Sequence, residues 1–274
     1  MCNNSNIEVF IMKSGVSTSC LYPLETAQAL TEVQNAGVEN VEIFLNTYSE
    51  LEPPYIETLV RTAQEKNTNV LAVHPFSCSM ESFFFATDYP LRQKDGFAFY
   101  EKYFIAAKAL GAKLFVFHGD YTKTPFPFKK HCENIVHLRE LAREYGVEFC
   151  QENVARCKCG RIDYIKRMRE YTNDDISFVL DVKQARRAKQ DPLEMIDAMS
   201  GKIAHIHMSD ETEFCDCALP GEGCFDTGAF FKQLIKSGFD GSIVTELYRG
   251  DFKEVAQLAQ SVSYINEQFA LAKA

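Results

Sequence analysis

Polar residues of the types that bind metals or move protons end six apolar runs of the sequence. Each run is short and strand-like, and its polar residue stands at or beside the last position. In chain order they are His74 in AVHPF, His118 in FVFHGD, Glu152 in CQENV, Asp181 in VLDVKQ, His207 in HIHMSD and Glu246 in VTELY.

A metal site is the chemistry that these residues predict together. A single histidine or carboxylate at a strand end more often caps a helix, bonds a loop or stays solvated. Six in succession differ, because strand ends on one rim of a barrel converge, and several buried carboxylates are costly without a cation. We predict that Glu152, Asp181, His207 and Glu246 are the metal ligands.

The ligand types narrow the choice of ion. Two glutamates, one aspartate and one histidine suit Mn²⁺, Mg²⁺, Co²⁺ or Zn²⁺ and argue against copper or iron–sulfur chemistry. We expect one ion, and the alternative of two stays open because of His74 and His118. These two histidines either join Glu152 around a second ion or hydrogen-bond a sugar hydroxyl.

A single (β/α)8 TIM barrel over residues 1–274 is the fold that would place these strand ends on one rim. Eight apolar runs alternate with segments of helical period. The expected strands are Ile7–Met12, Asn40–Leu45, Val70–Phe76, Lys113–His118, Val147–Asn153, Ile176–Asp181, Ile203–Met208 and Ser242–Leu247. The expected helices are Leu24–Ala36, Pro54–Lys66, Asp95–Leu110, Lys129–Tyr145, Ile162–Tyr171, Asp191–Met199, Asp226–Lys236 and Asp251–Ala272. An open doubly wound sheet would show the same alternation, but no GxGxxG follows the first expected strand.

Composition limits the partners and the compartment. The 274 residues carry a net charge of −9, which gives no general attraction to nucleic acid or anionic membranes. No apolar run reaches the roughly 18 residues of a membrane span, and MCNNSNIEVF does not resemble a signal peptide. We therefore expect a cytoplasmic protein whose ten cysteines are reduced. Four of them, Cys157, Cys159, Cys215 and Cys217, either meet around a structural zinc or are free thiols, and we favour free thiols.

The chain resembles the xylose isomerase-like TIM barrels, a superfamily of sugar isomerases, ketose 3-epimerases and endonuclease IV-type enzymes. The resemblance covers nearly the whole chain and rests on QENV, LDVKQA, HIHMSD, PGEG and TELY in this order. It implies a metal-dependent isomerase or epimerase acting on a sugar or sugar phosphate. In that reading Glu152 and Glu246 exchange a proton beside a metal-chelated carbonyl, and Asp181 and His207 are ligands only.

Two departures keep other functions open. His74 and His118 match the endonuclease branch, but Gln184 and CDCALPGEG stand where that branch has its third-metal ligands. A two-metal hydrolase of phosphodiesters or phosphate esters is therefore the alternative. Gln184 also replaces a histidine of the ketose 3-epimerases, and no arginine lies between His207 and Pro220. A non-catalytic sugar-binding barrel is the third hypothesis.

Several other residues are candidates for substrate contacts. Gln184, Glu222 and Glu42 are the predicted ones, although Glu42 is expected to serve the core and Glu222 is equally typical of a solvated turn. The run from Arg186 to Lys189 either binds a phosphate or forms a solvated face. We expect His205 to point away from the site. The aromatic run FFF at 83–85 either covers the sugar or packs against a helix. If it covers the sugar, a neighbouring subunit of a homo-oligomer is one way to complete the cover.

Overall fold

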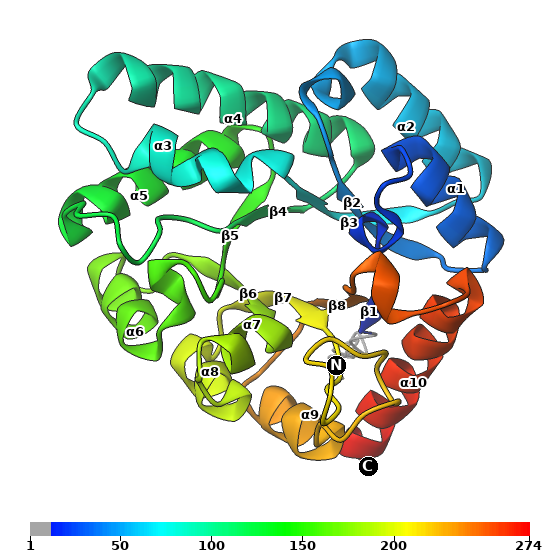
Figure 1. Ribbon diagram of the computed structural model, residues 1–274. Coiled ribbons are helices and arrows are strands. Elements are labelled where there is room, and N and C mark those ends of the chain that lie inside the picture. The colour runs from blue at the N-terminus through cyan, green and yellow to red at the C-terminus, as the bar shows by residue number, and fades with distance from the viewer. Residues whose placement is uncertain (1–11) are drawn as a thin grey trace, which may run out of the picture.

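The alternation of apolar runs and helical segments builds a closed barrel of eight parallel strands. The computed structural model describes residues 12–274 and orders the strands around the barrel as they follow in the chain (Figure 1). Parallel pairing of β1 with β8 closes it, with Lys13 opposite Ser242. The strands are β1 Lys13–Ser17, β2 Asn40–Phe44, β3 Asn69–His74, β4 Leu114–Phe117, β5 Glu148–Glu152, β6 Ser177–Asp181, β7 Ile203–Met208 and β8 Ser242–Thr245.

Helices surround the barrel on the outside (Figure 1). They are α1 Thr26–Asn35, α2 Pro53–Glu65, α3 Glu81–Phe85, α4 Pro90–Leu110, α5 Phe128–Glu144, α6 Ile162–Tyr171, α7 Val182–Arg187, α8 Pro192–Met199, α9 Thr227–Lys236 and α10 Val255–Lys273. Short 3-10 turns follow several strands, at Thr18–Leu21, Tyr48–Leu51, Phe76–Met80, Lys158–Gly160 and Arg249–Asp251.

The predicted TIM barrel is confirmed, and most predicted elements agree with the structure to within one or two residues. The predicted strand Ile7–Met12 lies outside the described residues except for Met12, which is not in a strand. β1 is instead Lys13–Ser17, a run with a lysine, two serines and a glycine that shows no strand pattern. The helices α3 and α7 were not predicted, because each is too short to show a helical period.

The barrel interior has two layers of different character. A small apolar layer consists of Ala72, Val116, Cys150 and Val179. Residues two positions apart in a strand point to the same side. The residues two positions further along these strands, His74, His118, Glu152 and Asp181, therefore also face the interior. They form a polar layer at the carboxyl ends of the strands, while the large aromatic core lies between the barrel and the helices.

Candidate metal centre

The four predicted metal ligands lie together at the carboxyl ends of β5 to β8. Three carboxylate oxygens surround Nδ1 of His207: Glu246 Oε2 at 3.3 Å, Glu152 Oε1 at 3.6 Å and Asp181 Oδ2 at 3.9 Å. Ligand atoms of Glu152, Asp181 and His207 all lie within 4.8 Å of one another. The rim of ligands inferred from the sequence is therefore one compact cluster.

The cluster has the properties expected of a divalent cation site. Glu152, Asp181 and His207 are each at most 2% exposed. The buried atoms Asp181 Oδ2 and His207 Nδ1 have no hydrogen-bond partner among the described residues, and Glu152 Oε2 faces the imidazoles of His118 and His74. Buried polar atoms normally have a hydrogen-bond partner, and buried carboxylates normally bind a cation. Carboxylate oxygens with one imidazole nitrogen suit a hard or borderline divalent ion, so these residues fit the predicted metal.

The protonation of His207 follows from its neighbours. Burial lowers the pKa of this imidazole, but the carboxylates of Glu246 and Glu42 outweigh burial and raise the pKa well above its usual value. Burial raises the pKa of Asp181 to about 6; Lys183 opposes the rise, and Glu152 and Glu246 add to it. A metal ion bound by this cluster would have to displace the proton on His207 Nδ1, since a histidine ligand is neutral.

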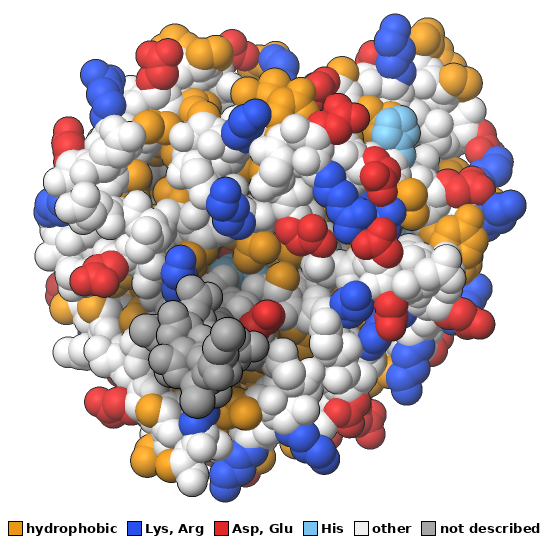
Figure 2. All heavy atoms as spheres, turned by 180° about the vertical axis from the view of Figure 1, so that it is seen from behind, with side chains coloured by type: hydrophobic (Ala, Val, Ile, Leu, Met, Phe, Trp, Pro, Cys, Tyr) orange, Lys and Arg blue, Asp and Glu red, His pale blue; other side chains and the backbone are white. Residues whose placement is uncertain are grey.

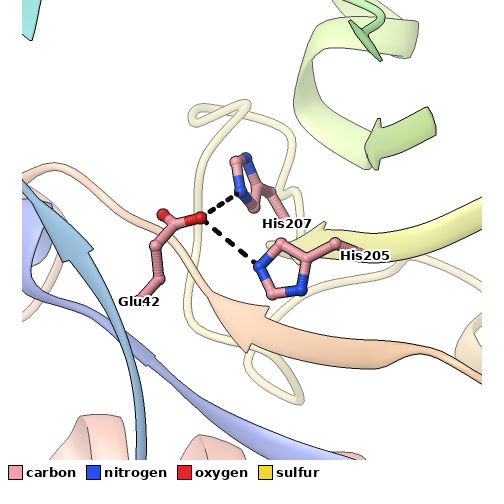
Figure 3. Close-up of side chains that lie close together, drawn as sticks. All are labelled: Glu42, His205 and His207. Atoms are coloured by element: carbon pink, nitrogen blue, oxygen red, sulfur yellow. Dashed lines mark hydrogen bonds and ion pairs between the residues drawn. The ribbon is translucent and has the colours of Figure 1, made fainter. Parts of the chain in front are cut away.

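Glu42 fixes the orientation of His207 from inside the barrel. Its Oε2 lies 3.1 Å from His207 Nε2 and 3.4 Å from His205 Nε2 (Figure 3). Its Oε1 accepts a hydrogen bond of 2.9 Å from Ser17 Oγ. With Nε2 turned to this carboxylate, Nδ1 is the nitrogen that faces the other three carboxylates. A metal-ligating histidine commonly uses its second nitrogen in this way.

The expectation that His205 points away from the site is wrong. His205 and His207 are two residues apart on β7, so both side chains face the barrel interior. His205 is fully buried, and its Nδ1 lies 2.7 Å from Ser242 Oγ. Its Nε2 is directed at Glu42 (Figure 3). Glu42 serves the interior, as expected, and it contacts two histidines there.

Replacing Glu42 by glutamine is expected to lower the affinity for a divalent metal by about 10–100-fold. The amide leaves His207 without the carboxylate that orients it. Titration calorimetry with Mn²⁺ would measure the change. Ser17→Ala is the matched control, because it removes the hydrogen bond to the other oxygen of Glu42 and leaves Oε2 beside His207. Equal metal affinity in Glu42→Gln and the wild-type protein would contradict this role.

His74 and His118 form a second cluster with the other side of Glu152. His118 Nε2 lies 2.8 Å from Glu152 Oε2 and 3.0 Å from His74 Nε2, and His74 Nε2 lies 3.7 Å from the same oxygen. Ligand atoms of the three residues lie within 4.8 Å of one another, which is close enough for one ion. Burial lowers the pKa of His118 although Glu152 opposes it, so this imidazole favours the neutral form that a metal ligand needs.

Lys183 is a member of the site that the sequence did not reveal. It occupies the first turn of α7, and its buried Nζ lies 3.5 Å from Asp181 Oδ2 and 3.4 Å from Glu246 Oε2. Burial lowers the pKa of this amine, but Asp181 and Glu246 outweigh burial and raise it well above its usual value. The side chain is therefore an ammonium ion beside two predicted metal ligands.

A cleft of about 650 Å³ opens above the cluster. Glu152 and Glu246 line it, together with His74, His118 and Gln184, whereas Asp181 and His207 are not among its lining residues. Three aromatic residues of its wall, Tyr22, Phe44 and Phe76, follow or end other strands of the barrel. The cluster thus presents two glutamates to the cleft and keeps the other two predicted ligands beneath them.

The predicted substrate residues differ in where they lie. Gln184 lines the cleft, although its Oε1 accepts a hydrogen bond from the Ala155 backbone at 3.0 Å. Glu222 is exposed in the PGEG turn and does not line the cleft. That turn is organised by Asp210, whose carboxylate accepts hydrogen bonds from the backbone of Gly221 and Gly223.

The cysteines and the aromatic run lie away from the cleft. Among residues 12–274, no group that could hold a metal includes Cys157, Cys159, Cys215 or Cys217. The aromatic run forms α3. Phe85 is buried there beside Tyr100, and Phe83 is half exposed under the guanidinium of Arg92.

The chain belongs to a known family, the xylose isomerase-like TIM barrels, whose sequence pattern matches residues 30–268. One relative, the "Uncharacterized protein ML2432" of Mycobacterium leprae (strain TN), is 23% identical over 264 residues, covering 86% of this chain and 89% of that protein.

Solved structures of sugar epimerases share the fold. A D-tagatose 3-epimerase-like protein superposes with a TM-score of 0.78 at 18% identity, over 96% of this chain and 98% of that one. An L-ribulose 3-epimerase gives 0.78 at 15% identity, over 96% of each chain. A xylose isomerase-like TIM barrel protein from Mycobacterium smegmatis in complex with magnesium gives 0.70 at 15% identity, over 90% of this chain and 89% of that one. At these identities the likeness establishes the fold.

The surface carries both charges. On the face shown in Figure 2, Lys and Arg side chains are interspersed with Asp and Glu, and the described residues there form no continuous basic patch. Within residues 12–274, none of the helices has both the length and the apolar character needed to cross a membrane.

Proposed function

We propose that this chain is a divalent-metal-dependent sugar isomerase or epimerase in which Glu152 and Glu246 exchange a proton beside the substrate carbonyl. The observation that carries the proposal is the division of the cluster, with these two glutamates lining the cleft and Asp181 and His207 lying beneath. The sugar epimerases that share the fold support it.

The chain's own groups suit the reaction. Glu152, Asp181, His207 and Glu246 would hold the metal, which acts as a Lewis acid toward a substrate carbonyl and makes the neighbouring C–H more acidic. In the metal-free cluster, burial raises the pKa of Glu246, but His207 and Lys183 outweigh burial and lower it to about 2. Glu246 is therefore a carboxylate at neutral pH and can accept a proton, and Glu152 is the second acid–base group within the same cleft.

Deuterium incorporation tests this proposal. The metal-loaded protein would be incubated in D₂O with a panel of ketoses, aldoses and their phosphates, and each sugar analysed by NMR. We expect deuterium at the carbon next to the carbonyl of at least one sugar. A protein that binds metal but exchanges no proton with any sugar of the panel would contradict the proposal.

A two-metal hydrolase is the second candidate, and the convergence of His74, His118 and Glu152 favours it. Two ions in one site suit the hydrolysis of a phosphate ester, because they can stabilise both the attacking and the leaving oxygen. The absence of the third-metal residues noted above weakens phosphodiester cleavage as the activity.

Counting metal ions separates the two candidates. For the isomerase we expect one tightly bound ion per chain. His118→Ala should keep this single ion, because in the isomerase His118 is not a metal ligand and contacts only Glu152 and His74. Elemental analysis after dialysis would measure the number. Two ions in the wild-type protein and one in His118→Ala would instead support the hydrolase.

A further inference from the structure

Three cationic side chains line the cleft, although the chain as a whole carries a net charge of −9. Lys183 and Arg187 stand at the two ends of α7, and Arg156 follows β5. Among residues 12–274, the only acidic residues of the same lining are Glu152 and Glu246, which are both predicted metal ligands. The cleft is thus more cationic than the overall composition would lead one to expect.

The charges of the metal cluster balance without help from the arginines. Glu152, Asp181 and Glu246 contribute three negative charges at neutral pH when a divalent ion is bound. Lys183 and that ion would contribute three positive charges. The fourth carboxylate, Glu42, faces His205 and His207 below the cleft. The cluster therefore needs no guanidinium group of the cleft wall for its neutralisation.

Arg156 forms no ion pair within the described residues, although the more distant Glu81 contributes to raising its pKa. It is exposed, its Nη2 lies 4.0 Å from Cys78 Sγ, and its guanidinium lies 5.7 Å from the centroid of the Tyr121 ring. Neither neighbour supplies a negative charge at neutral pH, since burial raises the pKa of Cys78 to about 12. An arginine that is not paired with a carboxylate can form a bidentate pair with an incoming oxyanion.

The other basic residues nearby are already engaged. Arg187 forms a bidentate ion pair with Asp216, at 2.6 and 2.9 Å, and its Nη1 donates a hydrogen bond of 2.7 Å to the Tyr248 hydroxyl. Arg186 contacts Glu211 and backbone oxygens of the loop after β7 and does not line the cleft. Arg186 and Arg187 are therefore not free for the phosphate-binding role considered for the run from Arg186 to Lys189. Arg156 is the better candidate for that role.

We propose that the substrate of this cleft is an anionic sugar, and that Arg156 binds its charged group. The shared chemistry is an oxyanion on a sugar, either a phosphate ester or a carboxylate, located away from the carbon that exchanges its proton. This inference rests on the proposed function, because it assigns the substrate class of the same cleft. A neutral ketose would leave the guanidinium of Arg156 without a partner.

Binding measurements on the full-length protein loaded with Mn²⁺ test the inference. Titration calorimetry would compare fructose 6-phosphate with fructose and glucuronate with glucose. We expect at least one anionic sugar to bind more tightly than its neutral counterpart. Arg156→Met is expected to weaken the binding of that anionic sugar by about 10–100-fold and to leave the neutral sugar unchanged. Arg156→Lys should retain part of the gain.

Arg161→Met is the matched control. Arg161 lies in the same loop, pairs with Asp163 at 3.2 Å and does not line the cleft, so its loss removes the same charge without affecting binding. Equal affinity for charged and neutral sugars, or a preference for the charged sugar that survives in Arg156→Met, would overturn the inference. Because calorimetry needs no turnover, a failure here is distinct from a failure to incorporate deuterium.

Discussion

Replacing Glu246 by glutamine is expected to lower kcat by about 10²–10⁴-fold, the usual contribution of a positioned acid–base group. The amide keeps the size of the side chain and one oxygen for the metal, but it cannot accept a proton. Glu246 is suited to this role because it lines the cleft and because the ammonium of Lys183, 3.4 Å away, favours its ionised form. Steady-state kinetics with the sugar identified by deuterium exchange would measure the loss.

Three further variants make this result specific. Glu152→Gln should cause a comparable loss, because Glu152 lines the same cleft. Asp181→Asn should lose activity together with bound metal, since Asp181 lies below the cleft as a predicted ligand. Glu222→Gln should behave as the wild-type protein, because Glu222 is exposed outside the cleft.

If Glu246→Gln kept both turnover and metal, the assignment of Glu246 as an acid–base group would be wrong. If it lost turnover and kept ligand affinity, the hypothesis of a non-catalytic sugar-binding barrel would be wrong.

The sequence predicted the barrel and the convergence of the candidate ligands because both depend on regular patterns. Strand ends of a parallel barrel share one rim, so polar residues that end successive apolar runs must meet there. The convergence of Glu152, Asp181, His207 and Glu246 follows this rule. The position of β1 could not be predicted in this way, because its run of lysine, serine and glycine residues has no apolar pattern. The strand is held by pairing with its two neighbours, β2 and β8.

The supporting residues of the site were harder to recognise. His205 shares a face with His207 by the two-residue period of a strand, and this signal could have placed it in the site. Glu42 ends no apolar run, so only the closed barrel shows that it reaches His207 from the opposite side. Lys183 belongs to a short helix, and its direction depends on how α7 leaves β6, which no periodicity encodes.

Lys183→Met is expected to destabilise the metal-free protein by about 3–5 kcal/mol, the usual cost of removing one partner from a buried ion pair. The ammonium lies 3.5 Å from Asp181 and 3.4 Å from Glu246, so its loss leaves two buried carboxylates without this cation. Urea unfolding in the presence of a chelator would measure the loss of unfolding free energy.

Adding Mn²⁺ should restore much of that free energy, because a bound ion stabilises the folded state and takes over the neutralisation of the same carboxylates. Lys158→Met is the matched control. Lys158 forms a partly buried ion pair with Asp120 at 2.5 Å, outside the cluster, so its loss should destabilise the protein equally with and without Mn²⁺. If Mn²⁺ stabilised the Lys183 and Lys158 variants to the same extent as the wild-type protein, Lys183 would be a structural cation only. Selective recovery of Lys183→Met would mean that the lysine and the metal neutralise one shared set of carboxylates, as the charge balance of the cleft requires.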